Sequence, residues 1–242
     1  MKIISCYFGK RETSVHPAPQ NFDCYFFSNN KKLKPVAEKM GWEFLLIKNE
    51  ELTADYHLSS LQSKYVKFLQ FDKCLINWEK DESILYFDHK FIVDFSVISE
   101  VLEQCKLDAL MFNSNVVYGN IQDEINEALP QKRYAKSMAK TIAWIDSLVE
   151  KQAYSYENSI TLTGFIFYKN VKKMTPLCDE VYRACMKLDQ PECQIIWSVL
   201  SQKLGGRVTK MNITDFDVAL KRPKLTMKQK IINLFIKIIH GK

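Results

Sequence analysis

A carboxylate, an imidazole and an ammonium group follow one another at Asp88, His89 and Lys90, directly after the apolar run Ile84–Phe87. A continuous apolar run of this kind fits a strand that is buried on both faces, as in a parallel sheet covered by helices. Ligands of such sheets bind at the carboxyl ends of the strands, where Asp88 would lie. The stretch fits a polar strand end without a ligand equally well, so the rest of the chain has to decide.

Two further lysines, Lys64 and Lys67, are three residues apart in a predicted helix that begins at Ser59 or Ser60 and runs to Trp78. Residues at this spacing share one face of a helix. Ammonium groups gathered there can bind phosphate groups. A solvated helix face carries the same pattern without a ligand, and the sequence does not separate the two interpretations.

Acidic and small residues mark other candidate positions. Glu124, with Asp123, could deprotonate an acceptor hydroxyl, although the preference of acids for a helix N-terminus explains both residues more simply. Thr163 and Gly164 interrupt a predicted strand, which fits either close approach by a sugar or a bulge.

The elements that would hold these residues alternate between strands and helices. Strand, loop, strand, helix and strand follow one another within about the first fifty residues, which predicts an α/β sheet. The predicted strands span residues 2–8, 22–27, 42–47, 84–87, 109–112, 160–168 and 208–211. The predicted helices span residues 35–40, 59–78, 97–104, 121–128, 134–151, 177–188 and 193–204.

Length and composition are those of an ordinary globular protein. The chain has 242 residues, of which 47% are hydrophobic and 26% charged, and its seven glycines and seven prolines exclude collagen-like and disordered classes. The seven cysteines form no CxxC pair, which predicts buried free thiols in a reducing cytoplasm rather than a zinc site. The N-terminal apolar stretch is too short for a signal peptide, and no apolar run reaches the length of a membrane span.

The net charge of +6 belongs to the C-terminal end of the chain. Residues 221–242 contain seven lysines and arginines and no acid, so the remainder carries 27 basic and 28 acidic residues. A neutral body argues against nucleic acid as a partner. From about Thr226 the tail has the pattern of a basic amphipathic helix, which suits the surface of an anionic membrane; alternatively, its apolar stripe packs on the body or on a second subunit.

Four short motifs occur in an order that resembles the GT-A class of glycosyltransferases, and most closely the bacterial enzymes that build lipopolysaccharide or capsule. The resemblance covers about residues 1–95, and its motifs here are Tyr7-Phe8-Gly9, Phe27-Ser28-Asn29, Ser63-Lys64-Tyr65-Val66-Lys67 and Tyr86-Phe87-Asp88. It implies a GT-A-like (Rossmann-like) fold, with a mixed and mostly parallel sheet flanked by helices. In this interpretation residues 1–222 form one domain, in which 1–100 bind the nucleotide-sugar and 101–222 form the acceptor part, and 223–242 form the tail helix.

The resemblance also implies roles for particular residues. Asp88 would be catalytic. We also predict catalytic roles for Lys90, which departs from the resembled motif, and for Glu124. The nucleotide-sugar donor would be bound by Tyr7, Phe8, Gly9, Ser28, Asn29, Lys64, Lys67 and His89. Glu192 and Gln194 lie where the resembled enzymes often place an acid near the donor sugar, although helix capping explains them at least as well.

An Asp-x-Asp motif in the resembled enzymes holds a divalent cation, manganese or magnesium, on the donor diphosphate, where it stabilises the charge of the leaving group. In this chain Lys90 replaces the second acid. Three interpretations follow: a metal held by Asp88 with His89 or Asp94, ammonium groups that replace the metal, or a degenerate site.

The sequence therefore predicts a glycosyltransferase that moves a sugar from a nucleotide-sugar donor to a lipopolysaccharide, capsule or other cell-surface glycan, or to a lipid-linked acceptor. We expect a cytoplasmic protein, peripheral on the inner membrane through its tail. The alternative is a nucleotide- or glycan-binding module of the same fold without activity. Another nucleotide-dependent α/β enzyme is a weaker third interpretation, because the glycine-rich phosphate-binding patterns are missing.

Overall fold

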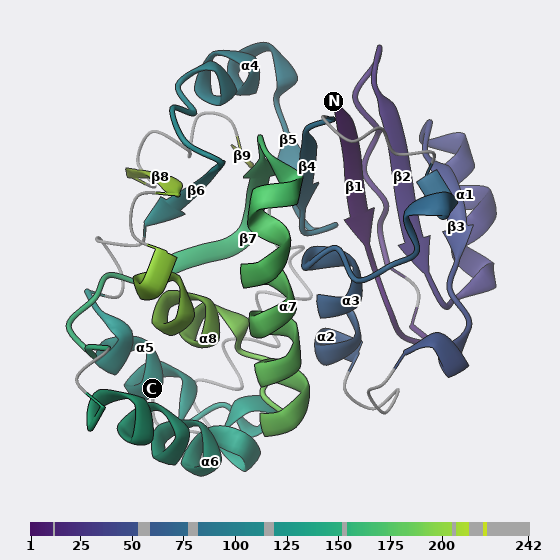
Figure 1. The fold of residues 1–242 in the computed structure, drawn as a ribbon. Coiled ribbons are helices and arrows are strands. Elements are labelled where there is room, and N and C mark those ends of the chain that lie inside the picture. The colour runs from purple at the N-terminus through teal and green to yellow at the C-terminus, as the bar shows by residue number, and fades with distance from the viewer. Residues whose placement is uncertain are drawn as a thin grey trace.

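A seven-stranded sheet with the order β3-β2-β1-β4-β7-β6-β8 forms the centre of the molecule (Figure 1). The computed structural model describes residues 1–11, 13–52, 59–76, 82–113, 119–151, 154–204, 207–212 and 220–221. The strands run at Lys2–Cys6 (β1), Asp23–Ser28 (β2), Glu43–Leu46 (β3), Ile84–Phe87 (β4), Ala109–Asn113 (β6), Thr161–Tyr168 (β7) and Val208–Asn212 (β8).

The N-terminal half of the sheet is parallel. β1 lies between β2 and β4, with Ile4 opposite Tyr25 on one side and Tyr86 on the other. Every residue of β1 and β4 is buried, as a strand that is covered on both faces requires. The carboxyl ends of β1 and β4 therefore meet at one edge of the sheet.

β7 makes the sheet mixed, because it runs antiparallel to both β4 and β6. β8 is parallel to β6. The predicted fold class, a mixed and mostly parallel sheet flanked by helices, is confirmed. β7 ends where β4 begins, since Tyr168 pairs with Ile84 and Phe165 pairs with Phe87.

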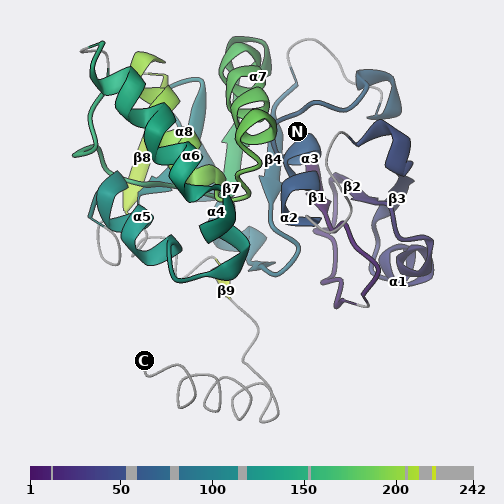
Figure 2. The same cartoon turned by 90° about the horizontal axis from the view of Figure 1, so that it is seen from below.

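Helices cover both faces of the sheet, as Figures 1 and 2 show. They run at Lys34–Lys39 (α1), Ser59–Gln62 (α2), Lys64–Lys67 (α3), Phe95–Glu103 (α4), Ile121–Ala128 (α5), Lys132–Val149 (α6), Val171–Leu188 (α7) and Cys193–Leu200 (α8). Alternate strand residues enter two core clusters: Ile4 and Tyr86 pack with α3, α7 and α8, whereas Ile3 and Leu85 pack with α1 and α4. A third cluster joins α5, α6 and α8.

The long helix predicted for residues 59–78 is wrong. The structure has two short helices, α2 and α3, and a separate 3-10 turn at Lys73–Ile76. The chain leaves the helical path at Leu69, whose φ is 56°, and the amide of Gln70 turns back to the carbonyl of Tyr65. The apolar spacing continues through this turn, so periodicity alone could not reveal it.

α7 is longer than predicted. It begins at Val171 rather than at 177, because the side chain of Asn170 caps it and the helix accommodates Pro176. α8 is shorter than predicted, since the chain tightens into a 3-10 turn at Ser201–Leu204. Proline is disfavoured in the interior of a helix, so the residues around Pro176 do not indicate a helix that passes through them.

A small two-stranded sheet was not predicted. It pairs Ile92–Val93 (β5) with Leu220–Lys221 (β9) in antiparallel fashion. Residues 223–242, on which the tail helix is predicted, lie outside the described residues, so that helix stays a prediction. None of the described helices combines the length and the apolar character that crossing a membrane requires.

Candidate functional site

Asp88 lies at the carboxyl end of β4, where the chain turns sharply. Its amide donates a hydrogen bond of 2.9 Å to the carbonyl of Gly164 in β7, and its carbonyl accepts one of 2.9 Å from the amide of Phe91. The hydroxyl of Ser5 in β1 donates to the carbonyl of Phe87 at 2.8 Å. Hydrogen bonds from three strands thus fix the backbone around Asp88.

The carboxylate of Asp88 is held by three side chains. Its Oδ1 atom accepts a hydrogen bond of 2.8 Å from the hydroxyl of Tyr86 and lies 3.2 Å from Nζ of Lys67. Its Oδ2 atom lies 3.4 Å from Nζ of Lys90. The Lys67 side chain is 5% exposed and that of Lys90 is 55% exposed, so one ion pair is internal and the other faces solvent.

The charges of this cluster stabilise one another. Burial alone would raise the pKa of Asp88, but Lys67 above all, with Lys90 and Lys64, holds that pKa well below its usual range. Burial likewise opposes the charge on Lys67, yet Asp88 and the neighbouring thiol groups raise the pKa of Lys67 above its ordinary value. Asp88 is therefore ionised and Lys67 is charged at neutral pH.

Lys64 and Lys67 are both buried, at 5% and 4% exposure. A solvated helix face, one of the two interpretations of this pair, does not fit that burial. No hydrogen bond or salt bridge joins the ammonium group of Lys64 to another of the described residues, although its charge contributes to the low pKa of Asp88. A buried ammonium group without such a partner is able to accept an anionic ligand.

Tyr7 and His89 lie beside the cluster. Their ring centroids are 4.9 Å apart in an edge-to-face arrangement. Burial lowers the pKa of His89, and the adjacent carboxylate of Asp88 only partly offsets this effect. His89 is therefore neutral at neutral pH and can offer a ring nitrogen or a ring face rather than a charge.

The loops after β1 and β2 are joined through Asn29. Its Oδ1 atom accepts a hydrogen bond of 3.0 Å from the amide of Gly9, which has a φ of 132° that other residues rarely adopt. Its amide nitrogen donates to Asn49 Oδ1 at 2.8 Å. Ser28 donates to the carbonyl of Tyr7 at 2.6 Å. These polar side chains follow parallel strands at the edge that carries Asp88.

Phe8 does not fit the role that was predicted for it. Its side chain is 2% exposed and packs in the core cluster beneath α3, α7 and α8. A ring that is enclosed by the core cannot stack on a ligand, so only the backbone of Phe8 remains available to the donor. The prediction that Phe8 binds the donor is corrected in this respect: its side chain takes no part.

Gly164 lies against Asp88. A Cβ atom there would be 2.9 Å from Cε2 of Phe91 and 3.3 Å from Oδ2 of Asp88. The pairing of β6 with β7 also changes register between Leu110 and Phe112, which is the irregularity expected of a bulge. The register shift agrees with the bulge interpretation, and the group that lies against Gly164 is the side chain of Asp88. Close approach by a sugar stays a prediction.

A second polar cluster involves Glu124 on α5. Its Oε1 atom accepts a hydrogen bond of 3.1 Å from Gln194, while Oε2 is buried with no hydrogen-bond donor among the described residues. Burial, and then the nearby charge of Glu192, raises the pKa of Glu124 to about 7. Asp123 closes a capping box with Asn120, so the helix-terminus interpretation holds for Asp123 and does not account for the burial of Glu124.

Glu192 caps α8, as the capping interpretation of this residue expected. Its Oε1 atom accepts a hydrogen bond of 3.4 Å from the amide of Gln194. The next residue, Cys193, connects this region to the Asp88 cluster: its Sγ atom lies 3.1 Å from Oγ1 of Thr163 and 4.0 Å from Nζ of Lys67. The two polar clusters are therefore neighbours.

Sequence reasoning missed Tyr86 and Cys193 as parts of the site. Tyr86 had a signal, because residues two apart in a strand point to the same face, so its hydroxyl and the carboxylate of Asp88 share one side. Cys193 had none: it begins a helix more than a hundred residues after Lys67, and only the packing of α8 on β7 brings them together.

A divalent cation does not fit the described side chains. Both carboxylate oxygens of Asp88 are paired with ammonium groups. Asp94, one of the expected ligands, caps α4 by accepting hydrogen bonds from the amide and hydroxyl of Ser96. Over the part of the chain that the structure describes, no group of three or more His, Cys, Asp and Glu side chains could hold a metal ion.

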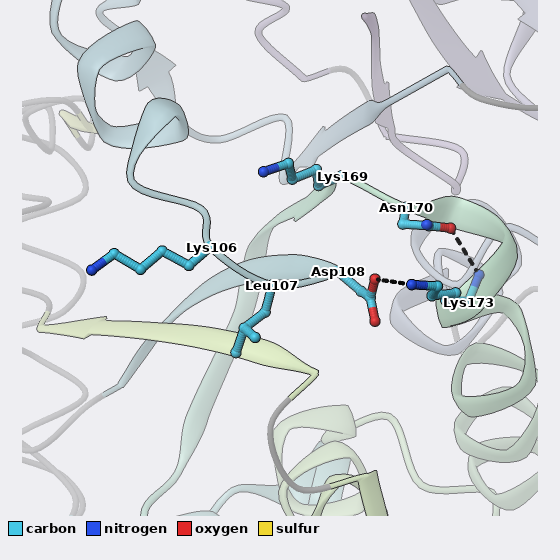
Figure 3. Close-up of a pocket in the computed structure, with 6 residues that line it drawn as sticks. All are labelled: Lys106, Leu107, Asp108, Lys169, Asn170 and Lys173. Atoms are coloured by element: carbon cyan, nitrogen blue, oxygen red, sulfur yellow. Dashed lines mark hydrogen bonds and ion pairs between the residues drawn. The ribbon is translucent and has the colours of Figure 1, made fainter.

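A separate pocket of about 440 Å³ lies at the opposite edge of the sheet (Figure 3). It is lined by Lys106, Leu107, Asp108, Lys169, Asn170 and Lys173. Asp108 is paired with Lys173 at 3.5 Å and with Arg207 at 3.0 Å. These residues lie near the start of β6 and the end of β7, away from Asp88, so the pocket is not part of the same site.

Several solved structures resemble the fold distantly, whereas no protein-family model and no curated protein matches the sequence. Mouse xyloside xylosyltransferase 1 shares 10% identity at a TM-score of 0.46, over 88% of this chain and 85% of its own. The galactosyltransferase LgtC, in complex with donor and acceptor sugar analogues, shares 14% identity at a TM-score of 0.47, over 88% of this chain and 74% of its own. These likenesses are too distant to assign a family or an activity to this chain.

Proposed function

We propose that this chain is a glycosyltransferase that moves a sugar from a nucleotide-sugar donor to a glycan acceptor. The observation that carries the proposal is the cluster of buried lysines around Asp88 at the carboxyl ends of β1 and β4. Ligands of α/β sheets bind at this edge, and buried ammonium groups suit the phosphates of a nucleotide. The order of the four N-terminal motifs supports the same class of donor.

In this proposal, different polar residues around the cluster bind different parts of the donor. Lys64, Lys67 and Lys90 bind the diphosphate. Gly9 lies in the loop after β1 and Asn29 lies in the loop after β2. These two loops hold the nucleoside by hydrogen bonds. Tyr7 and His89 provide an aromatic surface beside it, since rings stack readily on the flat faces of bases.

Glu124 is the candidate base for the acceptor hydroxyl. It is buried, its Oε2 atom has no described hydrogen-bond donor, and its pKa of about 7 suits a group that exchanges protons near neutral pH. Cys193 and Thr163 connect this region to Lys67. The position of Glu124 supports an acceptor that binds on the side of the cluster where α5 and α8 lie.

The acceptor that we propose is a lipid-linked or cell-surface glycan, such as lipopolysaccharide or capsule, reached at the inner face of a membrane. The basic, acid-free sequence of residues 221–242 motivates this proposal. The pairing of Lys221 with Ile92 supports it, because that pairing ties the start of the tail only a few residues from Asp88. A tail that binds anionic lipid would bring the cluster close to the lipid surface.

Turnover of nucleotide sugars tests the proposal. A panel of uridine, guanosine, cytidine and thymidine diphosphate sugars is incubated with the protein, and release of the nucleoside diphosphate is measured with and without added glycans. We expect release from one donor class, and a large loss in Lys90→Gln but not in Lys140→Gln. Lys140 forms a comparable surface ion pair with Asp189, at 3.8 Å, and thus controls for the loss of a lysine.

A binding module without activity is the second candidate, and the salt bridge between Lys90 and Asp88 favours it. A module would bind a nucleoside diphosphate at the same lysines and release no product from any donor. Turnover of the panel, together with binding of the free nucleoside diphosphates measured by calorimetry on the same protein sample, separates the two candidates.

A further inference from the structure

Both oxygens of the Asp88 carboxylate are paired with cations that belong to the protein. Lys67 holds Oδ1 from the buried side and Lys90 holds Oδ2 from the solvent side. The hydroxyl of Tyr86 occupies a further position on Oδ1. A metal ion would have to displace at least one of these groups, and the internal one is 5% exposed.

The cluster also has the charge of a divalent cation. Lys64, Lys67 and Lys90 contribute three positive charges and Asp88 contributes one negative charge, so the net charge is +2. The neighbouring imidazole of His89 adds none at neutral pH, because burial lowers its pKa. A charge of +2 fixed in a partly buried site is what a diphosphate needs as it leaves.

We propose that the three lysines around Asp88 replace the divalent cation, so that the chain binds and releases a nucleoside diphosphate without metal. This inference rests on the proposed function, since it assigns the charge stabilisation at the same site. Asp88 then acts as a positioning residue: it orients Lys67 and Lys90 and keeps the buried charge paired while no ligand is bound.

The bond changes place the positive charge at the leaving group. The bond between the anomeric carbon and the diphosphate oxygen breaks, and its electron pair stays on that oxygen. The acceptor hydroxyl oxygen forms a new bond to the anomeric carbon, and its proton passes to a base, for which Glu124 is the candidate. The negative charge that develops on the diphosphate is met by ammonium groups that carry their protons throughout, so the lysines stabilise charge without donating a proton.

The lysines differ in how free they are to do this. Lys67 is fixed, because its Nζ atom also lies 4.0 Å from Sγ of Cys193. Lys64 is buried, and no hydrogen bond or salt bridge joins its ammonium group to another described residue, so this group can pair with a ligand without breaking an existing contact. Lys90 is 55% exposed and can exchange Asp88 for a phosphate oxygen.

Binding of inorganic pyrophosphate and of UDP, measured by calorimetry in EDTA and then in manganese chloride, tests the inference. We expect both ligands to bind in EDTA, with a Kd that manganese changes by no more than about twofold. Lys90→Gln should weaken binding by about 10- to 100-fold, because a charged hydrogen bond to phosphate is lost. Lys140→Gln, which removes a surface lysine elsewhere, should leave the Kd unchanged.

A second variant tests the replacement directly. Lys90→Asp restores two acids at the spacing of a metal-binding pair, so its UDP binding should be lost in EDTA and recovered in manganese. Binding by the unaltered protein that requires manganese overturns the inference, whatever its turnover. Binding in EDTA without turnover of any donor supports the lysines as the diphosphate site and contradicts the proposed transfer. Absence of binding by the unaltered protein under both conditions overturns both.

Discussion

The ammonium nitrogen of Lys67 lies 3.2 Å from Oδ1 of Asp88, and only 5% of the Lys67 side chain is exposed. This pair joins α3 to the carboxyl end of β4. Burial of either residue without the other would be strongly unfavourable, because an isolated buried charge loses its hydration and has no counterion. The stability of the fold therefore depends on residues of the cluster to which we assign donor binding.

Asp88→Asn removes the charge that pairs with Lys67 while it keeps nearly the same shape. The free energy of unfolding should fall by about 3 to 5 kcal/mol, because the buried ammonium group loses its counterion. Urea-induced unfolding measures the difference. Asp189→Asn is the matched control, since its partner Lys140 is 64% exposed, and it should cost less than about 1 kcal/mol. Equal losses in the two variants would contradict an internal ion pair.

Tyr86→Phe deletes the hydroxyl that donates to Asp88 at 2.8 Å. The ring is 1% exposed and remains in place, so the variant removes the hydrogen bond to the charged acceptor and the weaker contact of the hydroxyl with Sγ of Cys6 at 3.8 Å. The free energy of unfolding should fall by about 1.5 to 3 kcal/mol, as determined by urea-induced unfolding. An unchanged value would show that the hydroxyl does not hold the carboxylate.

Gly164→Ala tests the close approach of β7 to the site. The added methyl group would meet Phe91 at 2.9 Å and Asp88 at 3.3 Å, and the variant should lose about 1 to 3 kcal/mol of stability through overpacking. In Gly119→Ala the methyl group meets Oδ2 of Asp123, an exposed residue, and disturbs only its capping hydrogen bond from the amide of Asn120. That variant should lose less stability than Gly164→Ala in the same unfolding assay, and a similar loss at both positions would count against the crowding at Asp88.

The raised pKa of Glu124 predicts that the free energy of unfolding depends on pH. This pKa is about 7 in the folded protein, raised by burial and then by Glu192 from its ordinary value of 4.5. The folded state therefore binds this proton more tightly than the unfolded state. The contribution is fully present below about pH 4.5 and is lost as the pH rises through 7, with a slope of up to about 1.4 kcal/mol per pH unit.

Glu124→Gln should remove that dependence. Relative to the unaltered protein, the variant should become more stable as the pH is raised from 5 to 8 in urea-induced unfolding. Glu103→Gln removes an exposed carboxyl group on α4, away from Glu124, and should leave the pH profile unchanged. Parallel profiles for the unaltered protein and Glu124→Gln would refute a protonated buried carboxyl group.

The membrane proposal depends on the tail alone. Deletion of residues 222–242 removes six lysines and arginines and no acid, so binding to vesicles that contain anionic lipid should be lost. Cosedimentation with anionic vesicles measures this, with neutral vesicles as the control. Unchanged sedimentation of the shortened chain would place the contact elsewhere.

The parallel core of the fold could be predicted from the sequence, because its strands carry unbroken apolar runs between clear turns. β4, at Ile84–Phe87, has the predicted bounds, and so does α5, at Ile121–Ala128. The break after α3 could not be predicted, since Leu69 adopts a positive φ without glycine and the apolar spacing runs on. The pairing of β5 with β9 joins residues more than a hundred positions apart, and two-residue strands carry no periodic signal.

The candidate site was predictable only in part, for a related reason. Asp88 and the two lysines of α3 stand next to recognisable elements, so their positions follow from local pattern. Whether those lysines are solvated or buried depends on the packing of α7 and α8 above them. The local sequence does not predict this packing. Cys193 reaches Lys67 only through that packing.

A crystal of the protein soaked with UDP and manganese chloride tests the central claim most directly. The account predicts the diphosphate of UDP beside Asp88, in contact with the ammonium groups of Lys64, Lys67 and Lys90, with no anomalous manganese signal between them. UDP bound elsewhere, for example in the pocket at Lys106 and Lys173, would contradict the proposed donor site. A manganese ion coordinated by Asp88 and the diphosphate would contradict the replacement of the metal by lysines.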